Sequence, residues 1–207
     1  MISRLKSLFS NVKKPKKGDS IIVVSGLPRS GTSMMMKMLA AGKIELFTDN
    51  LRVADGDNPE GYFEFERVKK LKDGDCAWLR QAQGKAVKVI SALLEFLPSE
   101  FNYQVIFMQR RMSEVLASQR TMLANRGELD KSMDDETMAE LFRKHLDAVK
   151  RWLSLQPNFR VLEVEYNRLL AEPSVDIARL SRFLNRPVDL ERMQAAINAS
   201  LYRHRFL

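Results

Sequence analysis

The sequence predicts an α/β fold in which helices flank a central, mostly parallel sheet. Two observations support this prediction. Short runs of almost wholly apolar, often β-branched residues recur along the chain, and amphipathic helical patterns lie between them. Strands that are apolar on both faces are typical of parallel sheets covered by helices on two sides. Ligands bind such sheets at the carboxyl ends of the strands, so the residues after each run are the first candidates for a site.

Each predicted element rests on its own pattern. The strand candidates are residues 21–25, 86–90 (the weakest of them), 105–108 and 161–164. A helical run follows the first strand, and apolar residues return at helical spacing in two later segments. The helix candidates are residues 34–40, 138–153 and 177–184. Pro173 stands just ahead of the last of these, where the start of a helix tolerates proline.

The composition indicates a single folded domain over residues 20–207. A chain of 207 residues can bury one substantial core, and 45% apolar residues exclude a disordered chain. The single cysteine, Cys76, excludes an intrachain disulfide, and no run is long and apolar enough to span a bilayer. Residues 1–19 lack the apolar stretch and cleavage site of a signal peptide, so we expect a cytoplasmic protein.

The net charge of +8 is concentrated in a basic tail, residues 1–19. Six lysines and arginines against one aspartate give this tail +5, which leaves only +3 for the rest of the chain. A nearly balanced body is a poor electrostatic footprint for a duplex, so no nucleic-acid partner is expected. The tail is either a solvated segment or a peripheral membrane contact, since Ile2, Leu5 and Leu8 share one helical face beside lysines.

A phosphate-binding loop is predicted directly after the first strand. Gly26 and Gly31 stand between a strand and a helix at the spacing of a P-loop. Glycines let backbone N–H groups converge on an anion, and the helix N-terminus adds positive potential. Thr32 takes the place of the usual lysine, and the cation has moved to Arg29, which suits a donor with one phosphate beside the transferred group. This loop makes the prediction a three-layer P-loop fold; the alternative is a simple glycine turn with a helix cap.

Residues 28–32, with the sequence PRSGT, resemble the 5′-phosphosulfate-binding loop of sulfotransferases that use 3′-phosphoadenosine 5′-phosphosulfate (PAPS). The resemblance implies that Arg29 contacts the oxygen bridging phosphate and sulfate. It also implies a set of groups that hold the 5′-phosphate. These are the hydroxyls of Thr32 and Ser33 and the backbone amides of Ser30 and Gly31.

The family has a second signature, for the 3′-phosphate, in which an apolar strand ends in arginine and a serine follows eight residues later. Here the run of residues 105–109 leads into Arg110, and Ser118 stands at that spacing. Two turns of helix would bring Ser118 back to the phosphate that Arg110 binds, and arginine suits bidentate phosphate binding. Arg111 is the neighbouring alternative, although only Arg110 has the family spacing.

Further matches extend the resemblance over residues 20–205, with bacterial sulfotransferase-like proteins the most similar. Tyr166 and Leu169 precede Pro173 and a helix that ends in Phe-Leu, a pattern that implies structural roles. The R-K-G-x-x-G segment of the cytosolic aryl enzymes is missing, which leaves part of the 3′-phosphate site unassigned. Arg203 and Arg205 either substitute for it or belong to a frayed terminus.

Transfer requires the acceptor to lose a proton, so a general base is expected. The polar loop of residues 48–64 after the first helix is predicted to face the acceptor. Glu64 is the first candidate base, because the phenylalanines on both sides of it disfavour its charged form, and Asp49 is the second. Either carboxylate could instead simply solvate the loop. Lys88, behind a candidate strand, either assists at the sulfuryl group or lies on the surface.

The predicted function is transfer of a sulfuryl group from PAPS to a hydroxyl or amine acceptor, which is a small molecule, a sugar or a lipid. A sulfuryl group carries less negative charge than a terminal phosphoryl group, so no metal is expected. Two alternatives remain open. A P-loop small-molecule kinase would need ATP and magnesium, and a non-catalytic nucleotide-binding module would bind the donor without transferring anything.

Overall fold

The computed structural model describes residues 19–49, 51–52, 54–56, 58, 61–125, 127–128 and 134–197. All of the basic tail except Asp19 lies outside this part of the chain, and so do Arg203 and Arg205. Within the described ranges, no helix is both long and apolar enough to cross a bilayer.

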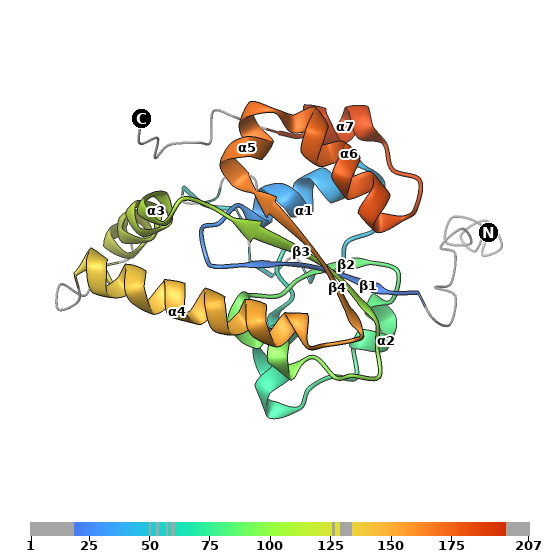
Figure 1. Ribbon diagram of the computed structural model, residues 1–207, viewed down its shortest axis with the longest axis horizontal. Helices are drawn as coiled ribbons and strands as arrows, with labels where there is room; N and C mark the ends of the chain where they lie inside the picture. Colours follow the sequence, from blue (N-terminus) through green and yellow to red (C-terminus); the bar gives the residue numbers. More distant parts are fainter. Residues whose placement is uncertain are drawn as a thin grey trace, which may run out of the picture.

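Four parallel strands form the central sheet in the order β2-β1-β3-β4 (Figure 1). They are β1 (Ile21–Gly26), β2 (Ala86–Lys88), β3 (Tyr103–Gln109) and β4 (Phe159–Glu165). All four predicted runs are therefore strands, and the predicted α/β class with a parallel sheet is confirmed. The six residues of β1 are all buried, as an unbroken apolar run in the middle of a sheet requires.

Helices cover both faces of the sheet (Figure 1). One face carries α1 (Thr32–Ala41), α5 (Tyr166–Ala171), α6 (Pro173–Leu184) and α7 (Leu190–Ala195). The other face carries η1 (Glu66–Asp73), α2 (Leu79–Ala82), η2 (Ser91–Phe96) and α4 (Asp135–Ser154). The remaining helix, α3 (Met112–Asn125), directly follows β3 and contacts α4. The three-layer arrangement predicted from the sequence is thus present.

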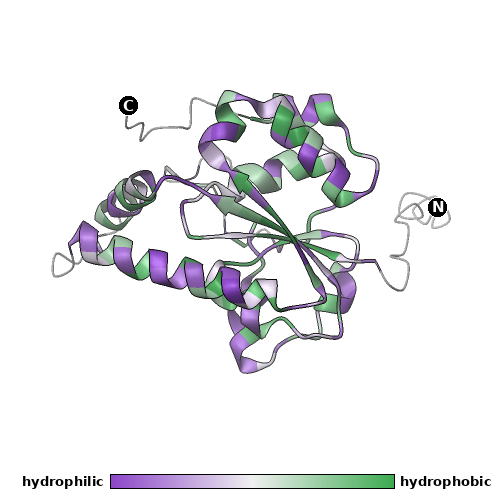
Figure 2. Cartoon of the chain, viewed as in Figure 1, coloured by the Kyte–Doolittle hydropathy of each residue, from purple (hydrophilic) through white to green (hydrophobic). Residues whose placement is uncertain are grey.

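Alternation along β1 divides the core between the two faces. Ile22 and Val24 belong to the cluster beneath α1, α6 and α7, whereas Ile21 and Val23 belong to the cluster beneath η1, α2 and η2. Successive strand residues point to opposite faces, so an apolar run with no polar positions can fill both layers. Figure 2 shows these strands as hydrophobic and the outward sides of α4 as hydrophilic.

The order of the strands places a crevice at the carboxyl end of β1. The chain leaves β1 for β2 on one side and then crosses to β3 on the other, so the connections run in opposite directions from β1. Val24 of β1 pairs with Lys88 at the end of β2 and with Ile106 of β3. Such a switch point is where ligands bind in open α/β sheets. It gathers the ends of three strands that are distant in the sequence.

Candidate active site

The loop after β1 turns sharply through residues in unusual backbone conformations. Arg29 has φ +68°, and Gly31, which caps α1, has φ +97°. The buried Ser30 hydroxyl donates a 2.7 Å hydrogen bond to the carbonyl of Leu27 and closes the turn. A non-glycine residue is rare at positive φ and is enriched at functional sites, so the conformation of Arg29 indicates a specialised loop.

Position 31 requires glycine for two reasons, its positive φ angle and the close approach of a neighbouring side chain. A Cβ added there would lie 2.3 Å from Cδ2 of Tyr166, the first residue of α5. The Arg110 guanidinium in turn lies over the Tyr166 ring, 4.6 Å from its centroid. The glycine therefore allows the loop to approach the ring of Tyr166. The same ring also contacts Arg110, the residue predicted to bind the 3′-phosphate.

Arg110 is held by three partners and is only 8% exposed. Its Nε donates a 2.9 Å hydrogen bond to the fully buried Glu114, and its Nη1 donates at 3.1 Å to the carbonyl of Arg29. The second carboxylate oxygen of Glu114 accepts at 2.9 Å from Asn167 Nδ2. Arg111, in contrast, is 58% exposed and lies 3.9 Å from Glu114. The structure thus distinguishes the two arginines, because only Arg110 lines the cavity.

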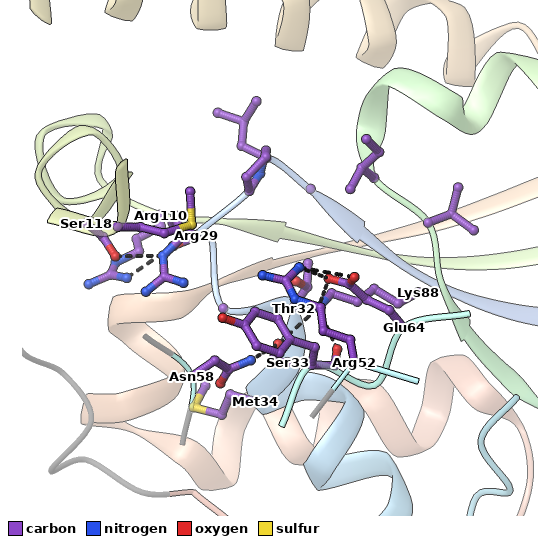
Figure 3. Close-up of a pocket in the computed structure, with 18 of the residues that line it drawn as sticks. Arg29, Thr32, Ser33, Met34, Arg52, Asn58, Glu64, Lys88, Arg110 and Ser118 are labelled. Carbon is purple, nitrogen blue, oxygen red and sulfur yellow. Dashed lines mark hydrogen bonds and ion pairs between the residues drawn. The ribbon is translucent and has the colours of Figure 1, made fainter. Parts of the chain in front are cut away.

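Arg29 reaches across to α3. Its Nε donates a 2.9 Å hydrogen bond to Oγ of Ser118, which is buried. Because Arg110 contacts the backbone of Arg29, the two predicted phosphate signatures form one connected group, as Figure 3 shows. Local sequence could not indicate that they touch.

Lys88 lies at the end of β2, with its side chain 8% exposed. Its Nζ donates to Oγ of Ser33 at 3.0 Å and to the carbonyl of Tyr62 at 2.7 Å, and lies 3.7 Å from Oε1 of Glu64. Burial lowers the pKa of Lys88 to about 8, although the Glu64 carboxylate acts in the opposite sense. The surface alternative for this lysine is therefore excluded.

Glu64 is held at the cavity by the residues around it. Arg52 Nη1 lies 3.1 and 3.2 Å from the two carboxylate oxygens, and the Arg52 guanidinium stacks 3.4 Å above the ring of Tyr62. The two flanking phenylalanines pack against opposite core clusters, which fixes the backbone on both sides of Glu64. The hydroxyl of Tyr62 donates to both carboxylate oxygens of Asp55, at 2.7 and 2.8 Å. Burial, and then this hydrogen bond, raise the pKa of Tyr62.

Asp49, the second candidate base, has a different position. It is not among the residues that line the cavity. Its two carboxylate oxygens accept from the backbone N–H groups of Leu51 and Glu66, at 3.1 and 2.6 Å. Asp49 therefore stabilises the turn into η1, which leaves Glu64 as the carboxylate that faces the cavity.

The site encloses a cavity of about 460 Å³, a volume typical of small-molecule sites. Its charged and polar lining residues are Arg29, Thr32, Ser33, Arg52, Asn58, Tyr62, Glu64, Lys69, Lys88, Arg110, Ser118, Thr121, Asn125 and Tyr166. Among these described residues five are cationic and one is acidic, so the cavity favours a ligand with several negative charges. Elsewhere in the described ranges, no group of three His, Cys, Asp or Glu side chains could hold a metal ion.

Several residues of the site were not predicted from the sequence. Arg52, Asn58 and Tyr62 stand in the predicted acceptor loop but carry no motif, and Glu114 sits inside α3 among ordinary helix residues. The signal for Glu114 was its spacing, one helical turn after Arg110, which brings the two side chains together. Nothing local could indicate Asn58, because its partner Ser33 is 25 residues away.

Comparison with known proteins assigns the chain to a family. A family model described as "Sulfotransferase domain" matches residues 19–204. No curated protein sequence matches significantly. Among solved structures, a sulfotransferase domain from the curacin biosynthetic pathway has a TM-score of 0.52 at 19% identity, covering 87% of this chain and 78% of its own.

Two further structures are similar in fold. The sulfotransferase domain of the Synechococcus PCC 7002 olefin synthase has a TM-score of 0.55 at 16% identity, covering 92% of this chain and 82% of its own. Mouse sulfotransferase SULT7A1, complexed with PAP (3′-phosphoadenosine 5′-phosphate), has a TM-score of 0.57 at 16% identity. The match covers 90% of this chain and 65% of the mouse chain. At these identities the likeness concerns the fold.

Proposed function

The chain belongs to the sulfotransferase family, and on that premise we propose how its cavity transfers a sulfuryl group from PAPS to a hydroxyl or amine acceptor. In this proposal the two phosphate groups of the donor bind at the two connected signatures. The 3′-phosphate takes Arg110 and Ser118. The 5′-phosphosulfate takes the turn after β1, where Gly31, Thr32 and Ser33 line the cavity at the start of α1. Ser30, which was also predicted to bind it, does not line the cavity, and its backbone N–H donates to the carbonyl of Leu27 at 3.2 Å.

The single observation that carries the proposal is the hydrogen bond from Arg29 to Ser118. It places the cation of the first signature and the hydroxyl of the second within one cavity, as a donor with phosphates at both ends of one nucleotide requires. The cationic excess of the lining residues supports the same ligand. The kinase alternative is not retained, because the family is that of sulfotransferases and Thr32 occupies the lysine position of NTPases.

The reaction needs one protein group at the leaving oxygen, one at the sulfuryl oxygens and one to take the acceptor's proton. The acceptor oxygen or nitrogen attacks sulfur while the bond from sulfur to the bridging oxygen breaks, and the electron pair leaves with the 5′-phosphate of PAP. Arg29 stabilises the charge that develops on that leaving oxygen. Lys88 lies next to Ser33 and stabilises the oxygens of the sulfuryl group while it is transferred. Glu64, 3.7 Å from Lys88, accepts the acceptor's proton.

Two measurements test this function. Calorimetry without magnesium should show that PAP binds and that 5′-AMP, which lacks the 3′-phosphate, binds much more weakly. Turnover of PAPS should then require an acceptor, which can be found by screening phenols, amino sugars and long-chain alcohols for release of PAP. A preference for ATP with magnesium would favour the kinase. Binding of PAP without transfer to any acceptor class would favour the nucleotide-binding module.

A further inference from the structure

The hydroxyl of Ser33 is engaged by two side chains from outside its own loop. Lys88 Nζ donates to Oγ at 3.0 Å, and Asn58 Nδ2 donates to the same oxygen at 2.9 Å. The three residues come from the start of α1, the end of β2 and the acceptor loop, and all three line the cavity. Figure 3 shows Asn58 directed at Ser33.

The orientation of the Asn58 amide is set by a second contact. The same Nδ2 lies 2.6 Å from the carbonyl oxygen of Gly61, which can only accept a hydrogen bond. The nitrogen, and not the oxygen, of the amide therefore faces both partners. Its two hydrogens go to Gly61 and to Ser33, which accounts for both donors of the amide.

A serine oxygen has two lone pairs and one hydrogen. When Lys88 and Asn58 donate to the two lone pairs of Ser33, the hydroxyl must use its remaining direction to donate its own hydrogen. Ser33 lines the cavity, so an anion bound there can accept that hydrogen. The ammonium of Lys88 also polarises the hydroxyl, which strengthens it as a donor.

We propose that Asn58 is a positioning residue, which together with Lys88 fixes the Ser33 hydroxyl as a hydrogen-bond donor to the anionic oxygens of the sulfuryl donor. This inference rests on the proposed function and deepens it. It adds a residue from the acceptor loop to the donor site. An unfixed hydroxyl could turn its lone pairs toward the anion, and the two negative ends would repel. Preorganised dipoles of this kind lower the barrier because they need no reorientation during the reaction.

A double-mutant cycle tests whether Asn58 acts through Ser33. We expect Asn58→Ala and Ser33→Ala each to lower kcat by about tenfold, the worth of one hydrogen bond. The combined variant should be no slower than Ser33→Ala within about twofold, because Asn58 then has no hydroxyl left to orient. Additive losses would overturn the proposal, since they would mean that Asn58 acts elsewhere.

Asn58→Asp provides a second, isosteric variant that retains the shape of the side chain. Its carboxylate can accept but not donate, so it would draw the Ser33 hydrogen away from the cavity. We expect this variant to be slower than Asn58→Ala, and Ser33→Ala should remove the difference between them. A merely structural role would give Asp the milder effect, because it fills the same volume.

The matched control is Asn158→Ala, which removes another asparagine that donates to a backbone carbonyl, that of Phe101, far from the cavity. It should lower the melting temperature without changing kcat. Calorimetry with PAP distinguishes a failure of the Asn58 role from a failure of the proposed function. A wild-type protein that binds PAP and turns over, but shows an additive cycle, refutes only the role of Asn58. A wild-type protein that binds no PAP refutes the proposed function, and the assignment of Asn58 with it.

Discussion

Arg29 and Ser118 lie 89 positions apart in the chain, yet Nε of the arginine donates a 2.9 Å hydrogen bond to the hydroxyl of the serine. The bond joins the turn after β1 to helix α3. Because each residue belongs to a different predicted phosphate signature, their contact brings the ends of the donor site together.

Replacement of Arg29 by methionine should affect turnover more than binding. The proposed charge on the leaving oxygen develops during the reaction, so we expect kcat to fall on the order of 100-fold. Affinity for PAP should fall less, because Arg110 remains in place. Lys72→Met, which removes an exposed cation that does not line the cavity, is the control and should leave kcat unchanged. A loss of PAP affinity with kcat unchanged would show that Arg29 serves binding alone.

Arg110 and Arg111 should respond differently to the same substitution. Loss of a charge-assisted hydrogen bond to phosphate predicts that Arg110→Ala weakens PAP binding by about 10- to 100-fold, measured by calorimetry. Arg111→Ala should change the affinity by less than about twofold, because its side chain is 58% exposed and does not line the cavity. Binding of 5′-AMP should be the same in both variants. The reverse ranking would assign the 3′-phosphate to Arg111.

Glu64 and Asp49 form a second pair whose roles can be separated. If Glu64 accepts the acceptor's proton, Glu64→Gln should reduce kcat on the order of 100-fold while PAP affinity and the melting temperature change little. Asp49→Asn should do the opposite, because it weakens two bonds to backbone N–H groups outside the cavity. A slow Asp49→Asn beside a fully active Glu64→Gln would reverse the assignment.

The lowered pKa of Lys88 predicts a pH dependence. In the free protein the ammonium loses its proton at about pH 8, so kcat/KM, which reports on the free enzyme, should fall as the pH rises through this value. Lys88→Met should be slow at every pH and should lack this fall. A wild-type profile that is flat up to the ordinary pKa of 10.5 would contradict the assigned environment.

The same pKa shift acts on stability with a definite sign. On unfolding, Lys88 returns to its ordinary pKa of 10.5, so between about pH 8 and 10.5 the unfolded chain binds more protons than the folded one. The contribution of this group to the free energy of unfolding therefore rises with pH across that window. Urea unfolding of the wild type and of Lys88→Met, below and above about pH 8, should show the difference moving in favour of the wild type. A difference that does not depend on pH would count against the burial of this charge.

Gly31 should be less tolerant of alanine than another glycine with a similar backbone. Gly31 has φ +97° and Gly74 has φ +83°, so each Ala variant pays about 1–2 kcal/mol for a left-handed conformation. Only at Gly31 would the new Cβ also meet an atom, Cδ2 of Tyr166, at 2.3 Å, whereas nothing lies within 4 Å at Gly74. We therefore expect Gly31→Ala to lower both the melting temperature and PAP affinity. Gly74→Ala should lower the melting temperature alone, and equal PAP affinities would argue against the Tyr166 contact.

Patterns that are local in the chain predicted much of this fold. The unbroken apolar run at 21–25 indicated a buried strand, and the glycines at 26 and 31 indicated the turn behind it, because strand burial and turn geometry depend on adjacent residues. The spacing of eight residues placed Ser118 two helical turns beyond Arg110, and the structure has both residues at the cavity. The weak run at 86–90 contains a strand at residues 86–88, and Lys88 at the end of this strand faces the cavity.

The choice between Glu64 and Asp49 shows where such patterns stop. Both carboxylates stand in a polar loop with no periodic pattern, and the sequence ranked Glu64 first only because phenylalanines flank it. Their difference arises from which way each side chain points, and that direction depends on distant contacts. The two phenylalanines beside Glu64 pack into opposite core clusters, while Asp49 is bound to backbone N–H groups at the entry to η1.

The sequence by itself determined the parallel sheet, the turn that faces the donor and the family, because each depends on residues that are close together in the chain. Only the tertiary structure decided which groups meet. The strand order brings the ends of β1, β2 and β3 to one crevice. Side chains from a helix, a strand and a loop meet there at single atoms, such as the Ser33 oxygen between Lys88 and Asn58. A hydrogen bond requires its partners within about 3 Å in space whatever their separation in sequence, and no local pattern records that distance.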